Sequence, residues 1–225
     1  MPPFPPGSGG IRVSSRHVGA GSRIASVEEA VTADTESSTS WPVPPQDGWT
    51  VDDLYSLPSL PPHTEMIDGG FVFMSPRRMF HSLAVDLLGD GLRQSVPECF
   101  RVRREMNIVL TPKTAPEPDL LVLHAEACRE RDETRYEAAD AVLVVEVVSP
   151  ESEERDRDTK PSKYARAGIP HFWRVEKGNG RRPVVYVYEL DPATRVYALT
   201  GIHHDHLKLS VPFDINIDLT AIDHL

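Results

Sequence analysis

The sequence predicts a mixed α/β (α+β) fold in which a β-sheet is flanked by helices. The run AVLVVEVVS at residues 141–149 is almost continuously apolar, as expected of a central strand covered on both faces. The segment DTKPSKYARAG at 158–168 follows it and is typical of a helix. Three further apolar runs, HFWRVE, PVVYVYEL and RVYALTG, are separated by turn-like segments. They indicate antiparallel strands at one end of the sheet.

The chain divides into a tail and one domain. Its 225 residues, 40% of them hydrophobic and 26% charged, suit a single soluble domain with an appendage. Residues 1–48 are rich in Pro, Gly, Ser and Thr and lack a periodic apolar pattern, so we expect a disordered tail there. A short helix at 26–31 is the one candidate element within it. The domain is then expected to span 49–225.

Signals for secretion or for a membrane do not occur in the sequence. The N-terminus has no charged region followed by an apolar one, and no apolar stretch approaches the roughly 20 residues of a membrane helix. The two cysteines, Cys99 and Cys128, lie in unrelated contexts and suit neither a disulfide framework nor a zinc site. We therefore expect a cytoplasmic protein without a membrane partner.

The first half of the domain contains both helices and strands. A helix capped by Thr50 comes first, and the segment HTEMIDGGFVFMSP at 63–76 follows as a hairpin that turns at DGG. A helix is then expected over 79–92. Strands are expected over 102–110 and 118–123, before the central strand begins.

The helix after the central strand has recognisable ends. Asp158 is its expected N-cap, Pro161 falls in the first turn, where proline is tolerated, and Gly168 stands just past the last turn. Lys160 lies early in this helix, which can turn back over the sheet. Asp156, just before the expected N-cap, is predicted to belong to a solvated charge run.

The formal net charge of −10 argues against a sequence-independent nucleic-acid binder, because phosphate contacts need clustered Lys and Arg. The charges are unevenly distributed, however. Between residues 151 and 182, nine Lys or Arg stand against six Asp or Glu, an excess of three positive charges. Any surface for an anionic polymer is therefore expected to involve this segment.

Glu146 is the residue that most needs an explanation. An acid inside a buried strand costs several kcal/mol unless it is paired or binds a metal. Asp119 opens another apolar strand directly after Pro118. If the two strands are neighbours, both carboxylates meet at one end of the sheet and, with a backbone carbonyl and waters, suit Mg²⁺. Lys160 could then stabilise developing negative charge. Asp, Glu and Lys around Mg²⁺ indicate phosphodiester hydrolysis.

Each of these residues also has a structural alternative. Glu146 can be paired with a nearby Arg or Lys, and Asp119 can cap a turn after a proline. Lys160 can be an exposed lysine of a first helical turn. His81 is predicted to be a satisfied surface or core histidine, and Tyr164, one turn after Lys160, to be mainly a packing residue.

Several motifs together resemble a known family. They are PD at 118–119, VVEVVSP at 144–150, YARAGIPHFW at 164–173 and EMIDGGFVFMSP at 65–76. The combination resembles the Uma-two family of restriction-endonuclease-like proteins, within the PD-(D/E)xK nuclease superfamily, and it covers essentially the whole domain. The resemblance implies a restriction-endonuclease-like mixed β-sheet flanked by helices. It also implies a Mg²⁺-dependent endonuclease, with Mn²⁺ as a substitute ion, that hydrolyses DNA.

Site residues follow from the same resemblance. It implies that Asp119 and Glu146 bind the metal and that the backbone carbonyl of Val147 assists them. Glu65, in the first of the family's motifs, matches a glutamate that joins the site directly or through water.

The catalytic lysine is where this chain departs from the common superfamily pattern. That lysine usually stands two residues after the strand acid, where this chain has Val148. In the family it resembles, the lysine lies in the following helix, so Lys160 is the match and Lys163 the alternative. Val148 and the acidic net charge favour a second hypothesis, a catalytically inactive module that binds nucleic acid or protein. A homodimer is a further expectation, by analogy with nucleases that cut both strands.

Overall fold

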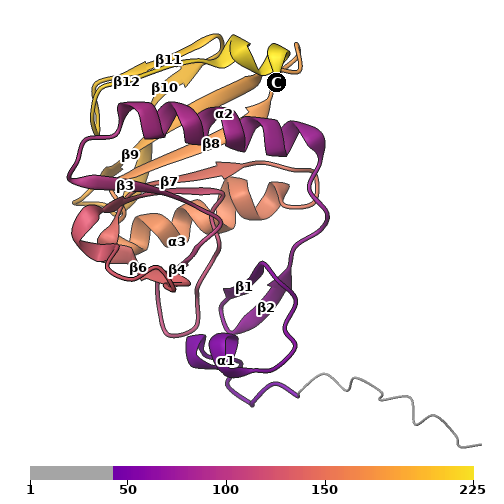
Figure 1. Ribbon diagram of the computed structural model, residues 1–225. Helices are drawn as coiled ribbons and strands as arrows, with labels where there is room; N and C mark the ends of the chain where they lie inside the picture. The colour runs from indigo at the N-terminus through magenta and orange to yellow at the C-terminus, as the bar shows by residue number, and fades with distance from the viewer. Residues whose placement is uncertain (1–42) are drawn as a thin grey trace, which may run out of the picture. The chain divides into compact units, whose positions relative to one another are not determined.

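The computed structural model describes residues 43–225 (Figure 1). Most of the predicted tail, residues 1–42 with the candidate helix at 26–31, lies outside the described residues. In the described part of that tail, the N–H of Gly48 donates to the carbonyl of Pro45 over 2.9 Å. This bond closes a turn directly before the first helix.

Six strands form the main sheet, in the spatial order β10–β9–β8–β7–β5–β3. They are β3 (Phe100–Arg104), β5 (Leu120–His124), β7 (Ala141–Val147), β8 (His171–Lys177), β9 (Pro183–Asp191) and β10 (Val196–His203). The neighbours β7 and β8 are parallel, whereas all other neighbours in this sheet are antiparallel. Two parallel strands need a crossover connection, and a helix supplies it here. The predicted mixed sheet with flanking helices is confirmed.

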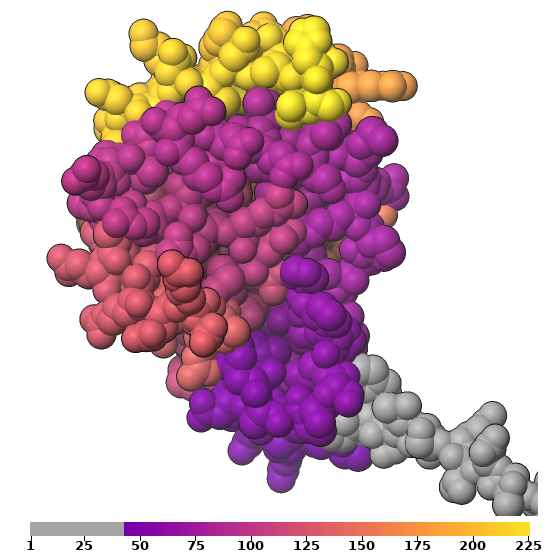
Figure 2. Space-filling view, viewed as in Figure 1, coloured from indigo at the N-terminus to yellow at the C-terminus, as the bar shows by residue number. Residues whose placement is uncertain are grey.

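The remaining elements surround this sheet (Figure 1). The helices are α1 (Val51–Ser56), α2 (Met79–Ser95) and α3 (Lys160–Ala167), and short helical turns cover Ala125–Ala127, Ala138–Asp140 and Leu219–His224. The small strand pairs are β1 (Thr64–Ile67) with β2 (Gly70–Phe73), β4 (Asn107–Val109) with β6 (Arg135–Glu137), and β11 (His206–Leu209) with β12 (Ile215–Asp218). The C-terminal segment, yellow in Figure 2, packs along α2.

Helices α2 and α3 pack on opposite faces of the main sheet, which decides the direction of every side chain in β7. Leu143 and Val145 belong to the hydrophobic cluster that includes α2. Val144 belongs to a second cluster, together with Tyr164 of α3. Because alternate residues of a strand point to opposite faces, Glu146 lies on the α3 side.

Strand 102–110 was predicted as one element, and this prediction is wrong. The structure has two strands there, β3 and β4, separated at Glu105, whose φ of +54° is in the left-handed region. A side chain in that conformation ends the ladder, so the chain leaves the main sheet and β4 pairs with β6 instead. The apolar pattern alone carries no signal for such a break.

The helix predicted to begin at Asp158 begins earlier. A wide helical turn, η3 (Arg155–Thr159), runs directly into α3, so Asp158 lies inside the helix and is not its N-cap. The N–H of Lys160 donates to the carbonyl of Arg155, five residues back. This wider turn suits the residue that follows, Pro161, because proline has no N–H to continue an ordinary α-helical ladder. No helix of residues 43–225 has the length and apolar character to cross a membrane.

Candidate active site

The two predicted acids come from neighbouring strands. Strands β5 and β7 are antiparallel with Leu120 opposite Val145, and one further step along this register places Asp119 opposite Glu146. Both residues are buried: Asp119 is 4% exposed and Glu146 is 2% exposed. The N–H of Val147 donates to Asp119 Oδ2 over 2.7 Å and ties the two strand ends together.

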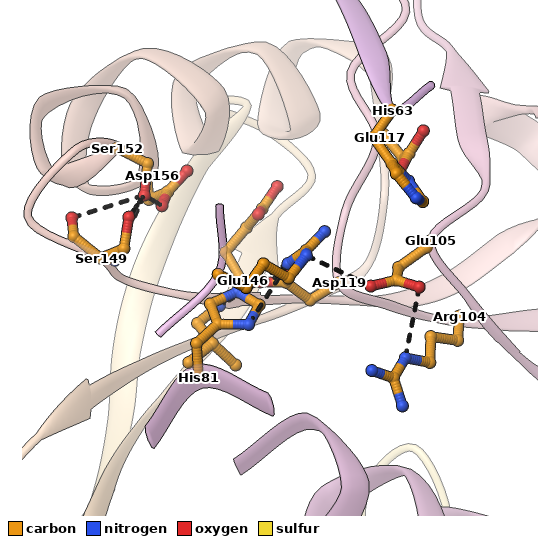
Figure 3. Close-up of polar contacts among 12 residues, drawn as sticks. His63, His81, Arg104, Glu105, Glu117, Asp119, Glu146, Ser149, Ser152 and Asp156 are labelled. Atoms are coloured by element: carbon orange, nitrogen blue, oxygen red, sulfur yellow. Dashed lines mark hydrogen bonds and ion pairs between the residues drawn. The ribbon is translucent and has the colours of Figure 1, made fainter. Parts of the chain in front are cut away.

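Asp119 and Glu146 line the same small pocket, whose volume of about 30 Å³ leaves room for roughly one or two water molecules. Figure 3 shows His81, Asp119 and Glu146 next to one another. The segment between β2 and α2, including Arg77, forms part of the pocket wall. The predicted meeting of the two carboxylates is therefore found in the structure.

Lys160 is the buried cation of this site. Its Nζ lies 2.6 Å from Glu65 Oε1, 3.2 Å from Glu146 Oε1 and 3.4 Å from Asp156 Oδ1, and the residue is 1% exposed. The alternative lysine, Lys163, lies elsewhere and pairs with an exposed aspartate of the β1–β2 turn. Of the two lysines, the structure brings Lys160 together with Glu65 and Glu146.

One ammonium group therefore faces three carboxylates. Burial raises the pKa of Glu146 well above its usual range, and the neighbouring acids add to this effect, while Lys160 opposes it. Burial likewise raises the pKa of Asp156. Burial lowers the pKa of Lys160, but the three acids together outweigh it and the net shift is upward. The lysine is thus held charged, and the acids around it have a deficit of positive charge that a proton or a second cation can fill.

Asp119 has its own partners, Arg77 and His81, which the sequence did not indicate. Arg77 Nη1 lies 2.5 Å and His81 Nε2 lies 3.0 Å from Asp119 Oδ1. Burial would raise the pKa of Asp119, but His81, Arg77 and the N–H of Val147 together hold it below its usual value. His81 was expected to be a satisfied surface or core histidine. It is buried and paired, and its partner is a site acid.

Two more residues of the helix belong to the site. The hydroxyl of Tyr164 donates to Glu146 Oε1 over 2.6 Å, so its role goes beyond the predicted packing. Asp156 is 2% exposed and accepts a short hydrogen bond from Ser152, so the prediction that it is solvated is wrong. The spacing of Asp156, Lys160 and Tyr164 at intervals of four residues places them on one helical face, and this signal could have found Asp156.

The donor set suits a hard cation. Carboxylate oxygens are what Mg²⁺ prefers, and one or two of them with waters are a typical protein contribution. Buried oxygens of Glu65 (Oε2) and Asp156 (Oδ1) have no hydrogen-bond partner. Among residues 43–225, however, no three His, Cys, Asp or Glu side chains are grouped to hold a metal in this conformation. The residues fit a Mg²⁺ ion by type, through Asp119 and Glu146.

The sheet order, the crossover helix and the paired strand-end acids together define a restriction-endonuclease-like protein. The chain belongs to the Uma2 family, whose model, described as "Putative restriction endonuclease", matches residues 51–221. A solved structure from Anabaena variabilis, titled a "putative nuclease belonging to DUF820", is similar with a TM-score of 0.59 and 16% identity, over 77% of this chain and 96% of that chain. At that identity the likeness is one of fold. No curated protein matches the chain.

Proposed function

We propose that this chain is a Mg²⁺-dependent endonuclease that hydrolyses DNA phosphodiester bonds. The observation that carries the proposal is the pair Asp119 and Glu146, which reach one buried pocket from neighbouring strands beside the ammonium of Lys160. Membership of a nuclease family supports a nucleic-acid substrate. Asp119 and Glu146 would hold the ion, with the carbonyl of Val147 as the expected backbone ligand.

Bound there, Mg²⁺ would polarise a phosphate oxygen and lower the pKa of a water. The chain's own residues have separate tasks. Lys160 carries a positive charge that stabilises negative charge developing at the phosphate. Glu65 holds this lysine at 2.6 Å and is itself fixed by the N–H of Glu117, which donates to Glu65 Oε1 over 3.0 Å. Tyr164 orients Glu146 through its hydroxyl.

The direct test is nicking of supercoiled plasmid with Mg²⁺ or Mn²⁺. We expect metal-dependent nicking that falls by about a hundredfold or more in Asp119→Asn and in Glu146→Gln, which keep the shape and remove the charge. The matched control is Glu154→Gln, which changes an exposed acid between β7 and α3. This variant should nick like the wild type. Nicking that survives both site substitutions would show that the activity lies elsewhere.

A second candidate function is a nucleic-acid-binding module without catalysis. It is favoured by the two cations that already neutralise the acids, Arg77 on Asp119 and Lys160 on Glu146, and by Val148 at the usual lysine position. The same preparations separate the two functions. Retention of plasmid on a filter, without nicking at any metal concentration, would identify the binding module.

A further inference from the structure

A second cavity lies beside α3, on the helix face next to the one that contacts the acids. It has a volume of about 510 Å³, within the size range of ligand sites. Four arginines line it, and we call it the arginine groove: Arg157, Arg166, Arg174 and Arg195. Three of the four come from the 151–182 segment whose sequence has an excess of positive charge.

Two of these arginines are paired with an acid and two are available to a ligand. The paired ones share Glu176, which lies 2.6 Å from Arg157 and 2.8 Å from Arg174. The guanidinium groups of Arg166 and Arg195, by contrast, make no ion pair or hydrogen bond within residues 43–225. Arg195 is nonetheless positioned, because its Nη1 lies so close to Gly168 that a Cβ atom there would be 2.4 Å away. The groove therefore presents two arginines that have no ion-pair partner, beside one acid in its lining, Asp158. Arg166 also interacts with Asp68 at longer range.

Aromatic rings form the inner wall of the arginine groove. Phe172 is buried, and its ring centroid lies 5.6 Å from that of Tyr188 and 5.5 Å from that of Tyr197. All three residues line the groove. Guanidinium groups above aromatic rings are the combination that binds single-stranded nucleic acids, because the cations contact phosphates while the rings receive bases. An acidic peptide would use the cations alone.

The arginine groove is linked to the candidate active site through a chain of shared lining residues. Arg157 also lines a neighbouring cavity of about 440 Å³, and that cavity shares Arg78, His81 and Ser149 with the pocket of the two acids. Lys177 adds another cation along this route. A strand that followed these lining residues would pass from the arginine groove to the pocket of the two acids.

Helix α3 and the turn before it explain why the two sites adjoin. Asp156, Lys160 and Tyr164 face the acids. The residue that follows each of them lines the groove: Arg157, Pro161 and Ala165. Successive residues of a helix are rotated by about 100°. The same helix therefore presents an acidic, buried site on one face and a basic, open groove on the next.

We propose that the arginine groove binds a single strand of nucleic acid, with phosphates on Arg166 and Arg195 and a base against the aromatic wall. The assignment rests on the proposed function in one respect, since the strand that continues toward Asp119 would be the substrate. It goes beyond that function by assigning strand binding to residues outside the catalytic pocket.

The test is fluorescence anisotropy of a labelled single strand of about 12 nucleotides, measured on the full chain in EDTA so that no metal-dependent cleavage occurs. Arg166→Gln/Arg195→Gln should weaken binding by about tenfold or more, and should reduce the slope of log K against log salt by about 1.4 for two lost contacts. Glutamine is chosen because it keeps a long polar side chain. The matched control is Arg129→Gln/Arg131→Gln, which removes the same charge from an exposed segment far along the chain from the groove.

The outcomes are distinct. Weaker binding in the groove variant alone supports the proposal. Equal weakening in both double variants would reduce the effect to net charge and overturn it, as would wild-type protein that fails to bind the strand. If polyglutamate competed as well as an unlabelled strand, the ligand would not be a nucleic acid. If a free mononucleotide competed as well, the groove would bind a nucleotide and not a strand. A chain that binds the strand but never nicks plasmid would instead contradict the proposed hydrolysis and support the groove.

Discussion

Arg77 Nη1 lies 2.5 Å from Asp119 Oδ1, so a guanidinium group contacts the acid that we propose as a metal ligand. The same side chain lies 3.3 Å from Glu105, and its Nη2 is buried without a hydrogen-bond partner. Glu105, with its left-handed backbone, is the residue that ends β3. The break in the predicted strand therefore also supplies an acid that holds Arg77 at the site.

Replacing Arg77 by alanine is expected to tighten metal binding. The substitution leaves Asp119 as a buried carboxylate with less positive charge around it, and a divalent cation can take the place of the lost guanidinium. Isothermal titration with Mn²⁺ should show a dissociation constant about tenfold lower, equivalent to about 1.4 kcal/mol. Arg93→Ala, which removes a surface arginine paired with Asp90, should leave the affinity unchanged. Equal affinities for Arg77→Ala and wild type would show that Arg77 does not compete with the ion.

Lys160→Met is expected to destabilise the fold. It leaves Glu65, Glu146 and Asp156 buried without their shared cation, and breaking a buried ion pair from one side costs about 3–5 kcal/mol. Lys163→Met is the matched control, because its partner Asp68 is exposed and such pairs contribute about 0–1 kcal/mol. Urea unfolding measures both. Two variants of equal stability would mean that the Lys160 cluster does not stabilise the native state.

Tyr164→Phe tests the hydrogen bond to Glu146. The substitution keeps the ring in its cluster but removes the donor from a buried carboxylate, which should lower the free energy of unfolding by about 1–3 kcal/mol. Tyr186→Phe is the comparison, since no hydrogen bond of its hydroxyl is found within residues 43–225, and it should change stability by less than about 0.5 kcal/mol. Thermal or urea unfolding distinguishes them. A Tyr164→Phe protein as stable as wild type would leave the hydroxyl without a structural role.

Gly91→Ala is expected to loosen the packing of α2 on β12. A Cβ atom at Gly91 would lie 2.6 Å from two side-chain carbons of Ile217, which is 3% exposed. Overpacking costs about 1–3 kcal/mol, whereas alanine gains about 1 kcal/mol of helix propensity, so the net expected loss is about 0–2 kcal/mol. At Gly180 no atom lies within 4 Å of an added Cβ, so Gly180→Ala should be nearly neutral. A stabilised Gly91→Ala protein would contradict the close approach.

Much of the fold was predictable from local patterns. The Thr50 cap of α1, the hairpin turn at DGG and Gly168 at the end of α3 are all present as expected. Glu146 was recognisable because an acid inside an apolar run conflicts with its surroundings. Asp119 and Lys160 were recognisable only through their order relative to that strand and through the family pattern.

Other parts of the site were decided by the tertiary structure. Arg77 and His81 contact Asp119 from some forty residues away in the sequence, and nothing in their own neighbourhood indicates that contact. Capping, alternation and turns depend on residues a few positions apart, so the sequence alone determined most of the elements and the conflict at Glu146. The grouping of charges depends on strand register, on a left-handed break at Glu105 and on the rotation of α3. These features arise only when distant segments pack together. They decided which cation pairs with each buried acid.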